Sequence, residues 1–477
     1  MSFTVPEAGP DPGASPTEEM PPPSNPLAVA RHLLTDWRQD DTGALTCRRW
    51  RGCWMRWTGT AWREWDEAQV RAHMYERLEH AVYDAGEDKD GRSQVRDWAP
   101  TRTKISNLLD ALAAITLLSS EVDAPSWIDE AEHADGGPIV ACANGLLRVR
   151  DRALLQHGPG FFNIVSVPYD FDPQATAPEW ETFLRRIWPD DADAVRALQE
   201  WFGYVLSGRT DQQKILLIKG PTRSGKGTIA RVLAELVGRK NLAGPTLAGM
   251  GSNFGLSSLI GKPLAVISDA RLSGKDGGQV VERLLTISGE DTIDIDRKFR
   301  DPWTGKLPTR LVILTNELPS FGDSSGVIAR RFVVLNMTVS WLGKEDTGLT
   351  EKLAAEMPGI LNWALDGLAR LERNGRITDP ESSRESVLIM QDTASPISAF
   401  IRERCATGPH TLVPVDILWT VWREWAEDSG IPAGNKQIFG RNLQSVVPQL
   451  HRTRPRDAAG QQVPTYSGIT LAPLSPQ

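Results

Sequence analysis

The apolar and polar positions along the chain change period from one region to the next. From residue 215 onward, short apolar runs alternate with stretches of helical spacing. The runs cover residues 215–219, 261–269, 311–316 and 332–335. Strand-length runs separated by amphipathic helices predict a parallel sheet with helices on both faces. Residues 178–206, which precede the first run, have helical spacing throughout. The middle of the chain is therefore predicted to be an α/β domain.

The two flanking regions have different patterns. Residues 28–172 mix predicted helices with a hairpin at 50–65 and with strands around an Asn-Gly turn, which predicts an α+β domain. Residues 415–427 and 435–446 are predicted helices, and a short hairpin follows them. Two helices and a hairpin in this order fit a winged helix. Residues 1–27 hold eight prolines and no Lys or Arg, so we expect them to be disordered.

A glycine-rich loop follows the first of the predicted strands and precedes a predicted helix. A strand, such a loop and a helix form a P-loop, in which backbone N–H groups and the helix N-terminus bind nucleotide phosphates. We expect the whole loop to contact ATP, that is Gly220, Pro221, Thr222, Arg223, Ser224, Gly225, Lys226, Gly227 and Thr228. Lys226 supplies the point charge. Gly227 stands where Ser or Thr usually binds Mg²⁺, so Thr228 is the nearest candidate hydroxyl.

Polar residues end or precede the other predicted strands. Asp269 ends the second strand, where a carboxylate can hold Mg²⁺ or polarise the attacking water. Asn316 ends the third strand and can orient that water. Alone, each would be a surface or turn residue, but their order after the P-loop favours catalysis. Arg330 and Arg331 precede the fourth strand and are either solvated or directed at the γ-phosphate of a neighbouring subunit.

A basic segment lies between the second and third strands of the predicted sheet. Lys298, Arg300 and Lys306 flank Trp303 and a predicted turn at Thr304-Gly305. Cations in this position suit contacts with the DNA backbone, which carry no sequence information. A solvated hairpin is the alternative interpretation.

Further candidate DNA contacts lie near the C-terminus. Lys436 and Arg441 belong to the second predicted helix, and Arg452 and Arg454 to the hairpin that follows. In a winged helix the second helix enters the major groove and the hairpin touches the backbone. A protein-docking module remains the alternative.

Composition limits the classes of function. The 477-residue chain has a formal net charge of −8, so nucleic acid would have to bind local basic patches. Four cysteines without a CxxC pair argue against a disulfide framework or a zinc site. The proline-rich N-terminus is not a signal peptide and no apolar stretch is long enough for a membrane, so we expect a cytoplasmic protein without membrane contact. Seventeen tryptophans, five of them within residues 50–65, indicate either packing or a stacking platform for unpaired bases.

The order of motifs resembles that of superfamily 3 helicases. More closely, it resembles phage- and plasmid-type primase–helicases with a poxvirus-type ATPase domain. The shared features are the P-loop, the strand ending at Asp269, a basic segment opening with Ser288-Gly-Glu-Asp291, and Leu314-Thr-Asn-Glu-Leu-Pro319. Lead-in segments at 144–172, 177–184 and 198–207, and C-terminal segments at 415–419, 439–443 and 466–471, also resemble that family.

This resemblance implies an AAA+-like ring, usually a homo-hexamer, with ATP and Mg²⁺ bound between neighbours and with single-stranded or forked DNA as partner. It assigns ATP-site roles to Lys226, Thr228, Asp269, Asn316 and Arg331, and a DNA-facing role to Lys298. Gly227 departs from the pattern, and Asp269 replaces a common glutamate. About 170 residues precede the ATPase and contain no closely spaced Asp pair at a strand end. We therefore expect a helicase without its primase domain and a separate primase or origin-binding protein as partner.

The expected segments are a disordered tail (1–27), a helicase-associated domain (28–172), a superfamily 3 ATPase domain (173–375), a linker (376–395) and a winged-helix DNA-binding domain (396–477). The favoured function is an ATP-dependent DNA helicase of mobile-element replication. One alternative is a DNA-binding initiator or loader whose ATPase switches assembly without unwinding. A small-molecule kinase is another, and the basic segment and C-terminal module argue against it.

Overall fold

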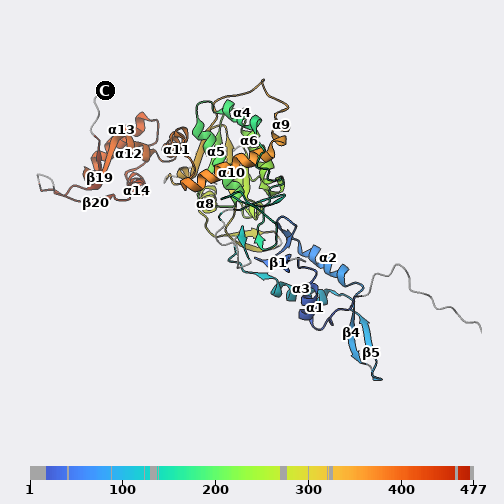
Figure 1. The fold of residues 1–477 in the computed structure, drawn as a ribbon. Helices are drawn as coiled ribbons and strands as arrows, with labels where there is room; N and C mark the ends of the chain where they lie inside the picture. Colours follow the sequence, from blue (N-terminus) through green and yellow to red (C-terminus); the bar gives the residue numbers. More distant parts are fainter. Residues whose placement is uncertain are drawn as a thin grey trace, which may run out of the picture. The chain divides into compact units, whose positions relative to one another are not determined.

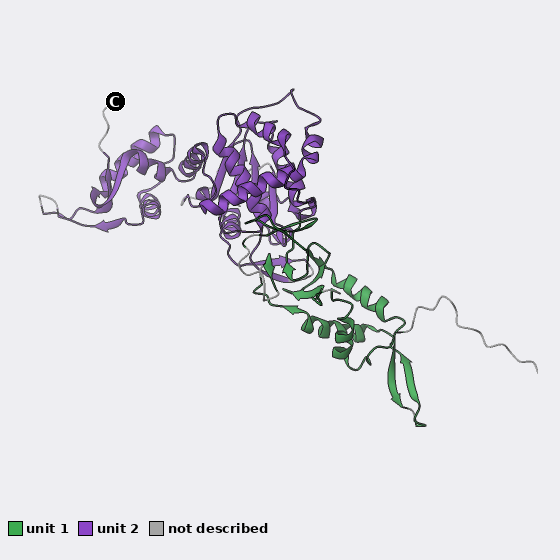
Figure 2. Ribbon diagram, in the orientation of Figure 1, with its two compact units in different colours: residues 1–166 green, residues 167–477 purple. Residues whose placement is uncertain are grey.

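The computed structural model describes residues 18–472 apart from 40–41, 88, 123, 129–136, 138, 269–276, 299, 320, 322–325 and 457–459. The chain forms two compact units, residues 1–166 and 167–477 (Figure 2). In the part of the chain described, no helix combines the length and apolar character needed to cross a membrane.

Unit 1 combines small sheets with helices. Its largest described sheet has the strand order β3-β2-β1-β6. The strands are β1 (Cys47–Trp50), β2 (Cys53–Trp57), β3 (Trp62–Trp65) and β6 (Leu117–Leu118), and the helices are α1 (Pro26–Leu33), α2 (Glu67–Leu78) and α3 (Arg102–Ile115). Asn25 caps α1 and Thr101 caps α3, each accepting a backbone N–H of its first turn. Leu33, Leu78 and Leu112 from the three helices pack into one core with Trp54.

Short hairpins complete unit 1. They comprise β4 (Val82–Glu87) with β5 (Ser93–Asp97), β8 (Ile139–Cys142) with β9 (Gly145–Arg148) and β10 (Leu154–Leu155), and β7 (Ser126–Trp127) with β11 (Phe161–Phe162). The β4–β5 hairpin extends away from the rest of unit 1 as an arm (Figure 1). The predicted hairpin turn between Trp57 and Trp62 is confirmed. The turn predicted at Asn144-Gly145 lies one residue earlier, at Ala143-Asn144, because Gly145 is the first residue of β9 and pairs with Cys142.

The expectation of a disordered tail over residues 1–27 is wrong for residues 18–27. Met20 is buried in the core of unit 1, and its N–H donates to the Val82 carbonyl. Glu18 accepts hydrogen bonds from Arg77, and Trp98 Nε1 donates to the Pro21 carbonyl. Composition did not reveal this, because one apolar side chain, one carboxylate and a few backbone groups hold the segment. Residues 1–17 lie outside the described part.

Unit 2 is built on a five-stranded parallel sheet with the order β13-β14-β17-β12-β18. Its strands are β12 (Ile215–Lys219), β13 (Leu242–Ala243), β14 (Leu264–Ser268), β17 (Arg310–Thr315) and β18 (Phe332–Asn336). The surrounding helices include α4 (Pro178–Ile187), α5 (Ala192–Ser207), α6 (Lys226–Val237), α7 (Leu247–Met250), α8 (Gly277–Ser288), α9 (Leu349–Ala355) and α10 (Met357–Asn374). The prediction of a parallel sheet in an α/β arrangement is confirmed.

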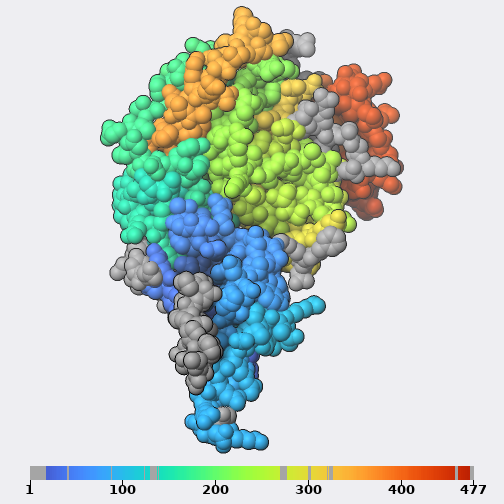
Figure 3. Space-filling view, turned by 90° about the vertical axis from the view of Figure 1, so that its right-hand side faces the viewer, coloured from blue at the N-terminus to red at the C-terminus, as the bar shows by residue number. Residues whose placement is uncertain are grey.

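Helices α5 and α10 lie side by side (Figure 1), and Figure 3 shows one face of the molecule with the segments of unit 2 coloured from green to red. An ion pair joins them, because Arg370 Nε donates to Oε1 of the buried Glu200 at 2.7 Å. Thr378 also donates its N–H and hydroxyl to Glu200. This carboxylate therefore fixes the chain that leaves α10 against α5.

The predicted linker instead contains helix α11 (Glu381–Ala394), which packs on β18. The contact is polar: the Val334 N–H donates to Ser383 Oγ at 2.8 Å, and Asn336 Nδ2 donates to Ser386 Oγ at 2.8 Å. Because Ser383 and Ser386 are buried on this helix beside a single fully buried large apolar residue, Met390, the hydrophobic pattern did not predict this packing.

The C-terminal region adds helices and a small antiparallel sheet of order β19-β21-β20. Its elements are α12 (Pro396–Arg404), β19 (Cys405–Pro414), α13 (Val415–Asp428), α14 (Lys436–Val446), β20 (His451–Thr453) and β21 (Thr465–Leu471). The two predicted helices are confirmed, and Leu418, Trp422 and Trp425 of α13 are buried. Strand β19 was not predicted.

Candidate nucleotide-binding site

The glycine-rich loop leaves the carboxyl end of β12 and enters α6, as the sequence predicts. Two glycines are required by geometry. A Cβ on Gly220 would lie 2.8 Å from Met337 Cβ, and Gly225 has a φ of +103°. A side chain at the first position would collide, and one at the second would be strained. The backbone of the loop is therefore fixed by its sequence.

Lys226 lies at the centre of the loop. Its Nζ donates to the carbonyl oxygens of Gly220 (2.5 Å) and Pro221 (2.8 Å) and to Asn316 Oδ1 (3.0 Å). Burial lowers the pKa of this ammonium group from its usual value. The structure thus brings together two predicted site residues that are separated by 90 positions in the sequence.

The N-terminus of α6 opens onto the same loop. Gly225 is the N-cap and has no side chain to bind the first-turn N–H groups. Unsatisfied N–H groups and the helix dipole favour an anion at this place. Thr228 in the first turn accepts a hydrogen bond from Arg231 Nη2 at 3.1 Å. Gly227 is exposed, and a Cβ there would meet only Arg231 Nη1 at 3.6 Å.

The carboxyl ends of three neighbouring strands are level with the loop. Lys219 of β12 pairs with Thr315 of β17, and Ser268 of β14 pairs with Leu314. Asn316 follows β17 and is exposed beside Lys226. Asp269, the predicted acid, comes one residue after Ser268 and lies outside the described residues. The register nevertheless brings the end of β14 to the edge that carries the P-loop.

The segment after β18 contacts the P-loop, which the sequence did not reveal. Ser340 Oγ donates to the Thr222 carbonyl at 2.8 Å, and the Trp341 N–H donates to the Arg223 carbonyl at 2.9 Å. Arg223 also forms an ion pair with Glu345 at 3.5 Å. These contacts arise because β18 lies beside β12 in the sheet, and no local motif indicates that pairing.

Arg330 and Arg331 lie at the opposite edge of the sheet. They end a short 3₁₀ helix, η3 (Ile328–Arg331), directly before β18. Arg331 Nη1 donates to Gln213 Oε1 at 2.7 Å, ahead of β12, and Arg330 is exposed. The five residues of β18 span about 16 Å at about 3.3 Å per residue. The structure therefore does not bring either arginine to the P-loop of its own chain.

The predicted basic hairpin is present as β15 (Ile293–Arg297) and β16 (Arg300–Gly305). The predicted turn at Thr304-Gly305 is wrong, because both residues lie in β16 and Thr304 Oγ1 donates to Asp294 across the strands. Lys298 instead lies in the turn and is exposed, and Lys306 is exposed after β16. The side chain of Arg300 lies outside the described residues. Trp303 packs into the core of unit 2.

The predicted C-terminal contacts are all exposed. Lys436 and Arg441 belong to α14, Arg452 to β20, and Arg454 to the loop after it. Lys436 also forms an ion pair with Asp416 of α13.

Family comparisons cover most of the chain. Residues 31–189 match the family described as D5 N terminal like, and residues 392–467 match the family described as Poxvirus D5 protein-like. Both D5-type matches support a phage-type primase–helicase family. The central residues 218–331, from the P-loop strand to Arg331, match a family of unknown function, DUF5906.

Solved structures resemble the chain over nearly its full length. Two apo structures of the NrS-1 C-terminal region match 93% of this chain and 99% of theirs, with TM-scores of 0.50 and 0.53 at 12% and 13% identity. At these identities the likeness concerns the fold alone. The D5-type families, together with the P-loop geometry, indicate an enzyme of the NTPase and helicase type that acts in DNA replication.

Proposed function

We propose that this chain is an ATP-dependent DNA helicase for the replication of a phage, plasmid or integrated element, and that it translocates on single-stranded DNA as a ring. The observation that carries this proposal is the contact of Lys226 with Asn316 at the mouth of the P-loop. A phosphate-facing cation at the start of α6 and a water-orienting amide directly after β17 are groups that promote hydrolysis of a γ-phosphate.

The loop fits the triphosphate of ATP. Lys226 and the first N–H groups of α6 bind the phosphate oxygens, and Asn316 holds the attacking water. Mg²⁺ supplies charge neutralisation for the phosphates when bound, and Thr228 and Asp269 are the residues that would hold it. Thr228 is present in the first turn of α6 as such a ligand set requires. Asp269 also serves as the group that polarises the water.

A ring explains why the arginines lie away from the P-loop of their own chain. A head-to-tail contact places the amino edge of one sheet against the carboxyl edge of the next, and Arg331 then reaches the neighbour's ATP. Each edge also has exposed apolar residues that such a contact would cover. They are Val327, Leu388 and Ile389 near η3, and Val339 and Leu342 beyond β18. A homo-hexamer is the form that the proposal expects.

The β15–β16 hairpin and the C-terminal region provide the proposed DNA contacts. The turn of the β15–β16 hairpin presents Lys298, and Lys306 follows its second strand; both suit phosphates of a single strand. In the C-terminal region, the order α12-β19-α13-α14-β20-β21 supports a winged helix. Its second long helix presents Lys436 and Arg441 for duplex contact, with Arg452 and Arg454 on the hairpin.

Strand displacement on a forked DNA duplex tests the proposal. The wild-type protein with ATP is expected to release the displaced strand, and the Lys226→Ala protein is not. If the protein hydrolyses ATP and binds the fork but releases no strand, the function is that of an initiator or loader. If no DNA is bound and phosphate is transferred to a small acceptor, the proposal is wrong.

A further inference from the structure

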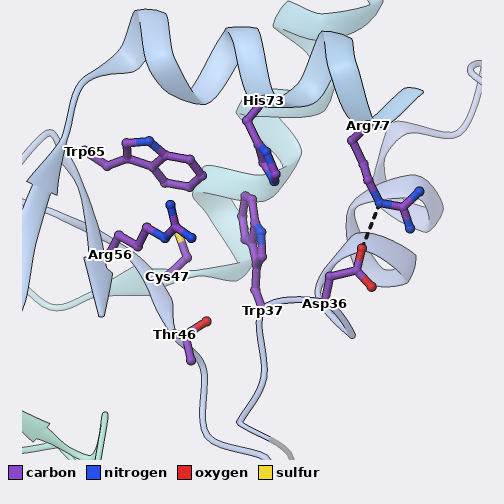
Figure 4. Close-up of a pocket in the computed structure, with 8 residues that line it drawn as sticks. All are labelled: Asp36, Trp37, Thr46, Cys47, Arg56, Trp65, His73 and Arg77. Carbon is purple, nitrogen blue, oxygen red and sulfur yellow. Dashed lines mark hydrogen bonds and ion pairs between the residues drawn. The ribbon is translucent and has the colours of Figure 1, made fainter. Parts of the chain in front are cut away.

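Unit 1 contains a cavity of about 220 Å³ that the nucleotide site does not use. Strands β1, β2 and β3, helix α2 and the segment after α1 form its walls (Figure 4). The lining residues are Asp36, Trp37, Thr46, Cys47, Arg56, Trp65, His73 and Arg77. Two indoles, an imidazole and two guanidinium groups are therefore gathered around one small space.

The aromatic walls are arranged around Trp65. The ring centroids of Trp37 and Trp65 are 6.0 Å apart at an interplanar angle of 66°, and His73 lies 5.5 Å from Trp65. The Arg56 guanidinium lies 5.0 Å from the Trp65 ring, and Figure 4 shows it beneath that ring. Trp37 is buried, whereas Trp65 and His73 are half-buried and Arg56 is exposed.

The polar groups of the lining divide into two sets. Asp36 accepts a hydrogen bond from Arg77 Nε at 3.0 Å, and Arg77 also binds Glu18, so these charges are paired. In contrast, the side chains of Arg56, His73 and Thr46 have no hydrogen-bond partner among the described residues. The N–H donors of Arg56 are therefore available to a ligand that offers acceptors and negative charge.

The chemistry of the lining argues against a metal. Burial raises the pKa of the Cys47 thiol to about 12, so the sulfur stays protonated. Within the described ranges, no three His, Cys, Asp or Glu side chains gather as metal ligands. Burial, with the charges of Arg56 and Arg77, lowers the pKa of His73, which keeps its ring neutral at neutral pH. A neutral imidazole stacks and exchanges hydrogen bonds with an uncharged heterocycle.

We propose that this cavity binds one nucleobase and that Arg56 at its exposed side binds the attached phosphate. Unpaired bases are bound by stacking on Trp or His rings and on Arg guanidinium planes, with hydrogen bonds to their edges. The cavity is smaller than the roughly 300–1,000 Å³ of sites that enclose a whole ligand. It therefore suits a planar base whose sugar and phosphate remain outside.

The nucleotide has two possible sources, a single strand of DNA or a free nucleotide. Binding of a DNA strand rests on the proposed function, whereas binding of a free nucleotide does not. Photo-cross-linking of the full-length protein separates them, using an oligo(dT) strand that contains one 5-iododeoxyuridine and, separately, 5-iododeoxyuridine monophosphate. We expect the strand to cross-link at Trp65 or His73, as read by mass spectrometry of the peptides. A cross-link from the monophosphate alone assigns the site to a free nucleotide.

Arg56→Ala is the matched variant, with Arg49→Ala as its control. Arg49 lies over Trp54 at 5.1 Å in the same sheet but does not line the cavity. Arg56→Ala is expected to weaken binding of the cross-linking ligand about 10-fold or more, as loss of a hydrogen bond between charged groups does, and Arg49→Ala is expected to have no effect. Basal ATP hydrolysis is expected to stay unchanged in both. Equal binding by the two variants together with no cross-link in unit 1 from either ligand overturns the proposal. If the protein binds the DNA strand but no cross-link forms in unit 1, the cavity proposal is wrong and the helicase proposal is unaffected.

Discussion

The two edges of the five-stranded sheet in unit 2 carry the same kinds of polar side chain but use them differently. At the carboxyl edge, Lys226 and Asn316 meet on an exposed surface beside an uncapped helix N-terminus. At the amino edge, Arg310 is buried and donates to the carbonyls of Val205 (2.8 Å) and Gly208 (3.1 Å) at the end of α5. One edge is arranged for a ligand, and the other is largely occupied by the protein itself.

This difference shows that a cation near a strand end has no fixed role. Burial lowers the pKa of Arg310 to about 10, so its guanidinium stays charged at neutral pH and stabilises the carbonyl end of α5. Arg331 is half-buried against Gln213, and only Arg330 of the three is exposed. Arginines at the amino edge are therefore expected to act within the fold or on a neighbouring subunit, never on the ATP of their own chain.

The largest expected effect tests whether an arginine at the amino edge acts on the ATP of a neighbouring subunit. Arg331→Ala is expected to lower ATP hydrolysis about 10³-fold, because an arginine finger contributes at least that much. Mixing this variant with Lys226→Ala subunits is expected to restore part of the activity, since mixed interfaces pair an intact Lys226 with an intact Arg331. ATPase assays across a titration of the two variants measure this. A fully active monomer, or no rescue at any ratio, contradicts a role on the neighbour, and Arg330→Ala is then the next variant.

At the carboxyl edge, Asn316→Ala is expected to lower hydrolysis about 10²-fold while nucleotide affinity changes little. The amide acts on the attacking water, and the phosphate cradle remains. Equilibrium binding of a fluorescent ATP analogue, compared with turnover, separates the two effects. If affinity and turnover fall together, Asn316 instead positions Lys226, which it contacts directly.

Arg310→Met sharpens the structural side of the comparison. The variant keeps most of the side-chain volume but leaves the carbonyls of Val205 and Gly208 without their donor, which is expected to cost about 2 kcal/mol of unfolding free energy. Arg330→Met, at an exposed position on the same edge, is the matched control and is expected to leave stability unchanged. Urea unfolding followed by circular dichroism measures both. Equal urea midpoints for the Arg310→Met and Arg330→Met proteins would mean that water replaces the lost guanidinium as donor to the two carbonyls.

The smallest effect concerns the hairpin. Replacing Lys298 and Lys306 with Ala is expected to reduce DNA-stimulated hydrolysis more than basal hydrolysis. Loss of two phosphate contacts should also flatten the dependence of log K on log salt by about 1.4 for a single strand. Binding of oligo(dT) over a series of salt concentrations gives this slope. An unchanged slope would mean that this segment is a solvated hairpin that does not contact DNA.

The sequence predicted the carboxyl edge better than the rest of unit 2. Runs such as 215–219 and 311–316 are long enough and apolar enough to specify buried strands, and parallel strands bring their final residues together. These two features predicted that Asn316 lies beside the P-loop. It could not show that the segment from Met337 to Glu345 contacts the loop, because strand order is not encoded locally.

Three other regions show where local patterns fail. Thr304-Gly305 has turn chemistry but is held in β16 by the cross-strand bond to Asp294. Strand β19 contains Gly408-Pro409, which interrupts any strand pattern, and pairing with β21 forms the strand regardless. Trp54 and Trp62 of the tryptophan hairpin are buried, which favours packing for these two, while the cavity beside Trp65 follows only from the tertiary structure.

The most direct test of the central claim is the rate of ATP hydrolysis by the purified protein with and without single-stranded DNA. The account predicts Mg²⁺-dependent hydrolysis that single-stranded DNA stimulates and that Lys226→Ala abolishes in both conditions. Hydrolysis that persists in the Lys226→Ala protein would contradict the P-loop assignment. Hydrolysis that needs Lys226 but does not respond to DNA would contradict its role as a motor on single-stranded DNA.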